Sequence, residues 1–377
     1  MFQKQTVFIL GAGASNPYSY PLGSDLIKNI IKNIEEDVIF LPAFDNSGNG
    51  ISFSEYDKIN NPLKFSYFNE IYNKGNFKQF EIIKGFTKQD SKGDYLHTEK
   101  LSGRKYYQIK ISNLEEFNKL KQALIDFDPV SIDAFLAHNP THEKVGKIMI
   151  MYSLLKIENT TMGANIEDNW YSHLISDIFS GCKNPEQILE NKLKMITFNY
   201  DMSLDYYLLQ NISNTEFFKN MARKFVEELN IQHVYGQLYE ANIEQQYGHY
   251  SGDSNHKNMQ RFLYSLQNYE KIKTIGESRQ EKANSVKKLI SDAEEIIIIG
   301  FGFQRDNLSL LGFPAKREDY KEFLNGKTLK YMDYDGKMNS LYNQFTQLAQ
   351  QHGSLITRST STEIVEAYQN DFKIYLY

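Results

Sequence analysis

Two short apolar runs constrain the fold more than any other feature of this sequence. Residues Thr6 to Leu10 (TVFIL) and Glu295 to Ile299 (EIIII) are each followed at once by a glycine-containing segment. Continuous apolar runs of this length are typical of strands that are buried on both faces. A third run, Leu193 to Phe198 (LKMITF), and a shorter one around Lys330 to Met332 complete the set of predicted strands.

Helical patterns separate these runs, and the alternation indicates the fold class. The predicted helices cover Ser24 to Glu36, Ser112 to Ile125, Ala283 to Ala293 and Met338 to Gln351. Strands that alternate with helices are typical of a parallel sheet with helices on both faces. We therefore predict an α/β fold: a doubly wound, mostly parallel, Rossmann-like sheet that carries a helical or mixed insertion.

The chain of 377 residues is long enough for roughly two to three domains, or for one large domain with an insertion. Residues 41–127 are rich in Asn, Gly, Lys and Tyr and follow no single period, and residues 131–179 become helical again. We predict an NAD-binding core from residues 1–40 and 190–377. Residues 41–189 would form an insertion or helical lid.

Composition excludes several classes of protein. A net charge of -5 gives no reason to expect attraction to nucleic acid or anionic lipid. The single cysteine, Cys182, excludes an intramolecular disulfide and a zinc site built from several thiolates. The sequence begins without a signal-peptide layout, and no stretch approaches the roughly 20 apolar residues that span a bilayer. We expect a soluble, cytoplasmic protein.

The first motif is Gly11-Ala12-Gly13-Ala14-Ser15, directly after a predicted strand and shortly before a helix. Glycines at such a turn let the backbone approach a pyrophosphate, and free amides there donate to it. The motif lacks the third glycine of the dinucleotide fingerprint, because position 16 is Asn. A plain strand-to-helix turn therefore stays an equal alternative.

The second motif is Thr197-Phe198-Asn199-Tyr200-Asp201, at the end of a predicted strand. The carboxyl ends of strands open onto the ligand crevice in α/β sheets, although Asn and Asp are also common turn residues. The third is His233-Val234-Tyr235-Gly236, where a lone histidine is more often a packing residue than a catalyst. The fourth, residues 300–306 (GFGFQRD), is a second glycine turn that could close over a nucleotide or simply end a strand.

In this order, GAGAS, TFNYD, HVYG and a hydrophobic strand leading into GFGFQRD resemble the sirtuin-like family, and within it the bacterial branch of NAD+-consuming antiphage defence proteins. Further matches are Tyr20 to Gly23 (YPLG), Ser131 to Leu136 (SIDAFL) and Ile275 to Arg279 (IGESR). Protein-deacylating sirtuins carry a zinc module held by four cysteines, whereas Cys182 is alone here. Deacylation is therefore disfavoured. The deacylases also have glycine directly after the histidine, and Val234-Tyr235 intervene here.

The resemblance implies an NAD+ glycohydrolase that needs no metal. Asn199 would orient the ribose and the attacking water, and Asp201 would support that network. His233 would contact the ribose hydroxyls and act as general base, which suits an unperturbed pKa of roughly 6.5. The implied NAD+-binding set consists of Gly11, Ala12, Gly13 and Ser15 at the phosphates, Asp25 nearby, and Thr197, Gly300, Gly302 and Phe303.

Such an enzyme would deplete cellular NAD+ during phage infection. The alternative is a non-catalytic subunit that senses NAD+ or an ADP-ribose derivative and signals to a partner. Constitutive destruction of NAD+ would kill the host. Because the predicted core and insertion take up nearly all 377 residues and leave no room for a sensor domain of roughly 100 residues, we expect activity to be controlled from outside this chain. We expect a homo-oligomer, or a complex with a partner such as a HerA-like hexameric ATPase or a short Argonaute.

Overall fold

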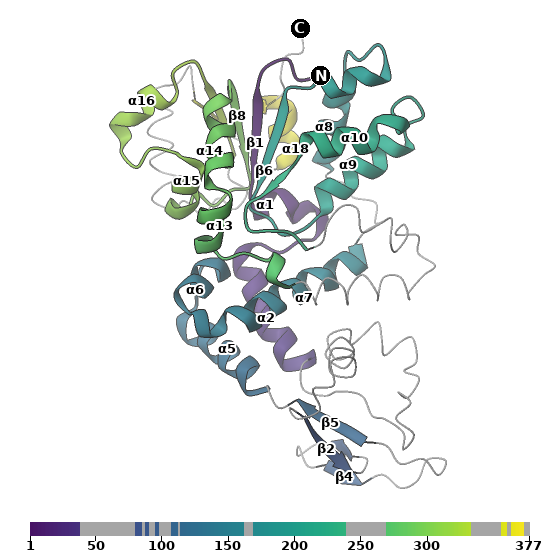
Figure 1. Cartoon of the computed structure of the whole chain (residues 1–377), viewed down its shortest axis with the longest axis vertical. Helices are drawn as coiled ribbons and strands as arrows, with labels where there is room; N and C mark the ends of the chain where they lie inside the picture. Colours follow the sequence, from purple (N-terminus) through teal and green to yellow (C-terminus); the bar gives the residue numbers. More distant parts are fainter. Residues whose placement is uncertain are drawn as a thin grey trace. The chain divides into compact units, whose positions relative to one another are not determined.

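The structure is a computed structural model. It describes residues 1–37, 80–84, 87–89, 95–97, 107–111, 114–161, 169–238, 269–332, 356–359 and 363–372. The helix predicted over residues 338–351 and the last five residues lie outside these ranges. Figure 1 shows the chain with its elements labelled.

The chain divides into two compact units. The first consists of Met1–Gly23, Thr160–Ala241 and Lys271–Tyr377, and the second of Ser24–Asn159 and Asn242–Glu270. The first unit contains the sheet and all four sequence motifs that were singled out as NAD+-binding candidates. The described residues of the second unit are mainly helical.

In the part of the chain that the structure describes, the sheet of the first unit has six strands, and all of their pairings are parallel. They are β1 (Thr6–Leu10), β6 (Leu193–Thr197), β7 (Gln232–His233), β8 (Glu295–Ile299), β9 (Thr328–Tyr331) and β10 (Ile356–Arg358). Their spatial order is β10-β9-β8-β1-β6-β7. Counted along the chain, this is the order 3-2-1-4-5-6 of dinucleotide-binding folds. The predicted doubly wound, Rossmann-like fold class is confirmed.

Burial explains why the two most apolar runs occupy the middle of the sheet. Every residue of β1 and of β8 is buried, as a strand with neighbours on both edges and helices on both faces requires. In register, Leu10 lies between Thr197 of β6 and Ile299 of β8, so these three strands end level with one another. The loops that follow them therefore start at the same edge of the sheet.

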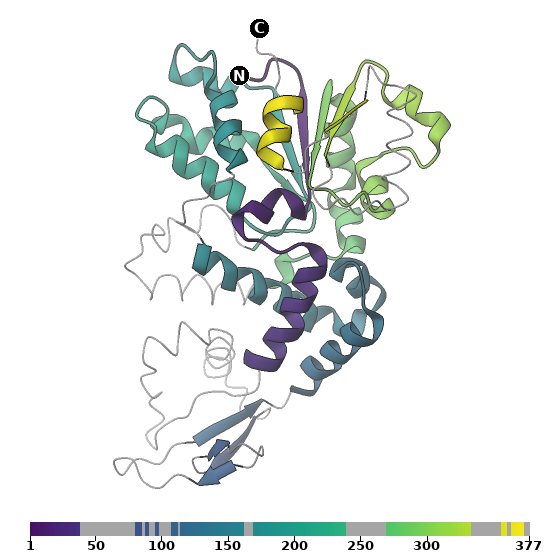
Figure 2. The same ribbon diagram turned by 180° about the vertical axis from the view of Figure 1, so that it is seen from behind.

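Helices flank this sheet on both sides. Those of the first unit are α1 (Ala12–Ser15), α8 (Trp170–Phe179), α9 (Ser203–Asn214), α10 (Ala222–Leu229), α13 (Ile275–Glu281), α14 (Ala283–Asp292), α15 (Arg305–Leu311), α16 (Tyr320–Phe323) and α18 (Ile364–Ala367). Figure 1 shows α8, α9 and α10 gathered beside β6, and α13 to α16 gathered beside β8. The reverse view in Figure 2 shows α18 in front of the central strands.

Within its described residues, the second unit contains four helices and two separate antiparallel strand pairs. The helices are α2 (Gly23–Asp37, of which all but Gly23 belong to this unit), α5 (Leu114–Phe127), α6 (Ile132–His138) and α7 (Glu143–Thr161, which belongs to this unit as far as Asn159). The strands are β2 (Phe80–Lys84), β3 (Thr87–Gln89), β4 (Tyr95–His97) and β5 (Tyr107–Ile111), with β2 paired to β5 and β3 to β4. A buried hydrogen bond of 2.8 Å from Asn33 Nδ2 to Ser153 Oγ joins α2 to α7.

The predicted domain boundaries differ from this division in three places. Residues 242–270 are predicted to belong to the core but are part of the second unit. Helix α2 was assigned to the core with residues 1–40, but its Asn33 bonds to α7, and α2 belongs to the second unit. Residues 160–189 were assigned to the 41–189 insertion, but they belong to the sheet unit. The reason is helix α8, whose Trp170 Nε1 donates to the Ala14 carbonyl at 2.9 Å and which thereby packs beside α1.

Candidate functional site

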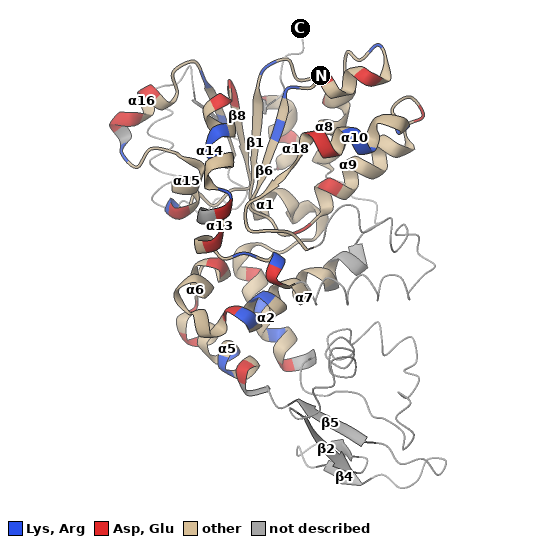
Figure 3. Cartoon of the chain, viewed as in Figure 1, with Lys and Arg blue, Asp and Glu red and all other residues tan. Residues whose placement is uncertain are grey.

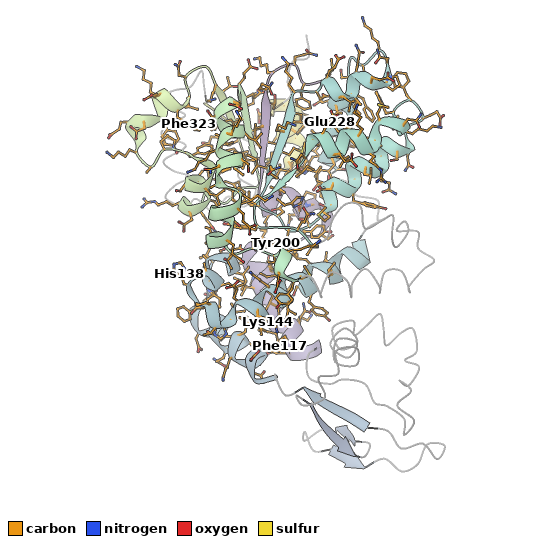
Figure 4. All side chains as sticks on the ribbon, in the orientation of Figure 1. Phe117, His138, Lys144, Tyr200, Glu228 and Phe323 are labelled. Carbon is orange, nitrogen blue, oxygen red and sulfur yellow. The ribbon has the colours of Figure 1, made fainter. Side chains whose placement is uncertain are left out.

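The candidate site lies at the carboxyl edge of the sheet in the first unit. Here Gly11 and helix α1 carry GAGAS directly after β1, TFNYD starts at the last residue of β6 and continues into the loop that follows, and β7 ends at His233. Figure 4 shows Tyr200 of the TFNYD motif at the end of the sheet where α1 lies, away from Glu228 of α10. Three of the four motifs therefore contribute to one edge, and the glycine turn after β8 joins them.

The two glycine turns pack directly on each other. The Gly11 amide donates to Ile299 O at 3.0 Å, and the Gly13 amide donates to Gly300 O at 3.0 Å. A Cβ on Gly11 would lie 2.4 Å from Gly300 O, and one on Gly300 would lie 2.2 Å from Ala14 N. Glycine is therefore required at both positions by backbone contact between the turns themselves. The Gly13 amide is expected to donate to a phosphate, but in this structure it already donates to the Gly300 carbonyl.

The other residues of the expected NAD+-binding set differ in burial and in the contacts that they make. Phe303 is 1% exposed and packs edge-on against Tyr331, so its side chain belongs to the core of the sheet unit. Gly302 faces open space. Thr197 Oγ1 accepts from the Asn199 amide at 3.1 Å and thus shapes the turn after β6. Asp25 belongs to the second unit, where it pairs with Lys28 at 2.8 Å and is half exposed.

Asn199 links the end of β6 to the loop after β1. Its side-chain Nδ2 donates to the Gly11 carbonyl at 2.9 Å and to Ser15 Oγ at 2.8 Å. The residue is 9% exposed. Ala12, between these two acceptors, is half-buried at the start of α1. Two acceptors on one nitrogen fix the plane of the amide, so the orientation of its oxygen Oδ1 is set by the protein.

A second branch of the same polar network runs through Asp201. Its Oδ1 accepts from the Ser203 amide at 3.1 Å and from the Ser203 hydroxyl, and Ser15 also hydrogen-bonds to the carboxyl. Ser203 Oγ in turn lies 2.9 Å from the hydroxyl of Tyr171 on α8. Burial raises the pKa of the Asp201 carboxyl, and the bonds from Ser203 and Ser15 and the charge of His233 oppose that rise. Burial also raises the pKa of the Tyr171 phenol.

His233 has both ring nitrogens beside oxygen acceptors. Nδ1 lies 3.2 Å from the Asn199 carbonyl, and Nε2 lies 3.1 Å from Asp205 Oδ2 on α9. Burial lowers the pKa of His233, but Asp205, the Asn199 carbonyl and Asp201 outweigh burial and raise it above its ordinary value. Neither ring nitrogen is turned toward open space, which differs from the arrangement that a general base at a ribose hydroxyl requires.

The sequence did not indicate three members of this network. Ser203 and Asp205 lie in the first turn of α9, two and four residues after Asp201, where their polarity is also typical of any helix start. Tyr171 carried no signal, because its contact with Ser203 joins residues 32 positions apart. Its ring stacks on Tyr18 with centroids 3.9 Å apart, which holds α8 against the segment after α1.

The SIDAFL motif, which supported the resemblance, forms the start of α6 in the second unit. Ser131 caps this helix by accepting from the Ala134 amide at 3.4 Å. Asp133 Oδ2 accepts from the Ser131 hydroxyl at 3.3 Å, and Oδ1 is buried with no hydrogen-bond partner. Burial raises the pKa of Asp133 to about 7.

Charge and metal-ligand patterns add little to the site. Figure 3 shows acidic and basic residues interspersed on the outer helices of the sheet unit, without a surface of one sign. Over the described ranges, no group of three or more His, Cys, Asp or Glu side chains is arranged to hold a metal ion. None of the helices in those ranges is both long and apolar enough to cross a bilayer.

Comparison with known proteins gives no relative. No protein-family model, no curated protein and no solved structure matches this chain. The fold class therefore follows from the strand order, and any function has to be inferred from the residues at the carboxyl edge of the sheet.

Proposed function

We propose that this chain is an NAD+ glycohydrolase of the sirtuin-like family, which cleaves NAD+ to nicotinamide and ADP-ribose. One observation carries the proposal. Ser15, Asn199, Asp201 and His233 come from three separate motifs and meet in one buried hydrogen-bonded network. That network lies at the edge of a 3-2-1-4-5-6 sheet where dinucleotides bind in this fold class.

The chemistry of the reaction suits such a network. The bond between the anomeric carbon and the nicotinamide nitrogen breaks, and its electron pair makes nicotinamide a neutral leaving group. Water forms the new bond to the anomeric carbon and loses one proton. The leaving group needs no acid, so the protein has to orient a water molecule, stabilise positive charge on the ribose and accept the proton.

We assign these tasks to residues of the network. Asn199 orients the water through Oδ1, because its Nδ2 is held by Gly11 and Ser15. The Asp201 carboxylate stabilises the positive ribose and accepts the proton from water, and burial makes it a stronger base by raising its pKa. His233 was expected to be the base, but both of its ring nitrogens already face acceptors.

A second candidate function is binding of NAD+ or an ADP-ribose derivative without turnover. The engagement of both nitrogens of His233 favours it, because a catalytic histidine usually offers a free lone pair. Purified full chain incubated with NAD+ separates the two candidates. If the chain is an enzyme, chromatography of the mixture will detect nicotinamide and linear or cyclic ADP-ribose. Calorimetric binding of NAD+ with no nicotinamide released would identify a sensor.

The proposed biological role is antiphage defence by NAD+ depletion in the cytoplasm. Control would come from a homo-oligomer or from a HerA-like ATPase or short Argonaute partner, through different affinities for inactive and active states. Light scattering tests for the oligomer, and turnover measured with and without an added HerA-like ATPase or short Argonaute tests for the partner. A monomer with full constitutive activity that cells tolerate at high expression would contradict this role.

A further inference from the structure

The environment of His233 restricts its protonation state. The ring is buried, with its side chain 3% exposed, so water does not supply alternative partners. Nδ1 lies 3.2 Å from the Asn199 carbonyl oxygen, which can only accept, so Nδ1 carries a hydrogen. A neutral ring would then present a lone pair on Nε2 to Asp205 Oδ2 at 3.1 Å. Two lone pairs at that distance repel unless a proton lies between them.

We propose that Asp205 and His233 form a buried charged pair in which the imidazole is doubly protonated and donates from both ring nitrogens. Asp205 is then a positioning residue that acts through His233. The imidazolium in turn holds the Asn199 backbone, and the Asn199 side chain holds the loop after β1 through Gly11 and Ser15. The assignment of the charged pair stands on the geometry around His233 and does not need the proposed function, whereas its kinetic consequence rests on the proposed function.

The surrounding charges favour this state. The charged groups that act on His233 are Asp205 on α9 and Asp201 in the loop after β6, and both are negative when ionised. Asp201 receives hydrogen bonds from Ser203 and Ser15 that stabilise its own charge. Burial of the ring disfavours the charged form, but Asp205, the Asn199 carbonyl and Asp201 together outweigh burial and raise the pKa of His233. The arrangement makes His233 a fixed donor rather than a proton acceptor.

Nitrogen NMR of the full chain in the absence of NAD+ tests the charged pair. The His233 ring signals are assigned by their loss in His233→Gln, and their shifts distinguish imidazolium from either neutral tautomer. At about pH 7, where an ordinary histidine with a pKa of about 6.5 is mostly neutral, we expect His233 to be mostly doubly protonated. A neutral His233 ring in the wild-type protein would overturn the proposal.

Two variants extend the test. Asp205→Asn should convert His233 to the neutral form with hydrogen on Nδ1, because the amide can donate to Nε2. Asp292→Asn is the matched control. Asp292 pairs with Lys288 on the exposed face of α14, where Lys288 is 75% exposed, so this variant should leave the His233 signals unchanged. Should Asp205→Asn fail to fold, Asp205→Glu retains the charge and should keep the ring doubly protonated. A His233 ring unchanged by Asp205→Asn in a folded protein would refute the pairing.

Kinetics then separate this inference from the proposed function. Asp205→Asn should lower kcat by about tenfold or more while KM changes less than about twofold, and Asp205→Glu should restore part of kcat. An imidazolium signal without any nicotinamide release would leave the charged pair intact and refute the enzyme. Nicotinamide release together with a neutral His233 ring would support the proposed enzyme and refute the charged pair.

Discussion

Gly300→Ala should destabilise the sheet unit severely, because Gly300 lies where two turns touch. Its φ is +59°, in the left-handed region, and a Cβ there would lie 2.2 Å from Ala14 N and 2.4 Å from Gly13 C. Both neighbours are backbone atoms that no rotamer change can move. Gly13 also donates its amide to the Gly300 carbonyl, so shifting either turn would break that bond.

The expected loss combines two costs. A residue with a side chain in the left-handed conformation costs about 1–2 kcal/mol. Overpacking at a closed contact adds about 1–3 kcal/mol. The sum of roughly 2–5 kcal/mol is a large part of the free energy of unfolding of a typical domain, about 5–15 kcal/mol. Gly300→Ala should therefore lower the denaturation midpoint strongly or prevent folding.

Urea denaturation of Gly300→Ala beside Gly302→Ala measures this loss. Gly302 lies in the same turn, but an added Cβ there meets nothing within 4 Å, so Gly302→Ala is the matched control and should change stability by less than about 1 kcal/mol. Equal stability of the two variants would refute the reasoning that the turns require glycine for contact with each other.

Three further predictions concern other parts of the chain. Tyr171→Phe removes the hydroxyl that lies 2.9 Å from Ser203 Oγ and should cost about 1 kcal/mol by chemical denaturation; no loss would exclude a contribution from this bond. Asp133 has a pKa raised to about 7, so the folded state binds an extra proton between the unfolded pKa and that value, and stability should fall as pH rises through this window. Asp133→Asn should flatten that decline, and an unchanged pH profile would contradict the shift. EDTA should leave NAD+ cleavage unchanged, because a neutral leaving group needs no Lewis acid; inhibition that added metal reverses would show otherwise.

The fold was predictable where burial and periodicity agree. The bounds of β1 (Thr6–Leu10) and β8 (Glu295–Ile299) were predicted to the residue, because each is an unbroken apolar run with a glycine segment at its end. Strand β7 (Gln232–His233) was not predicted, since two residues show no period. Placement of α8 with the sheet was also missed, because it depends on Trp170 reaching Ala14, a contact across 156 positions.

The candidate site was predictable as a place but only in part as a set of contacts. The motifs containing Ser15, Asn199 and His233 converge because the register of the parallel strands brings their ends together. The partners of those residues follow from tertiary packing, which leaves no pattern in the sequence. Asp205 is the clearest case, since nothing in its surroundings along the chain distinguishes it from an ordinary acidic residue in the first turn of a helix.

The most direct test of the central claim is nicotinamide release from NAD+ by wild-type protein beside Asn199→Ala. Asn211→Ala is the matched control, because Asn211 lies on α9 and its Nδ2 bonds to the Tyr207 carbonyl at 2.9 Å, outside the network. We predict that wild type and Asn211→Ala release nicotinamide at similar rates and that Asn199→Ala is slower by about 10²- to 10³-fold with its fold retained. Full turnover by a folded Asn199→Ala variant would contradict the account.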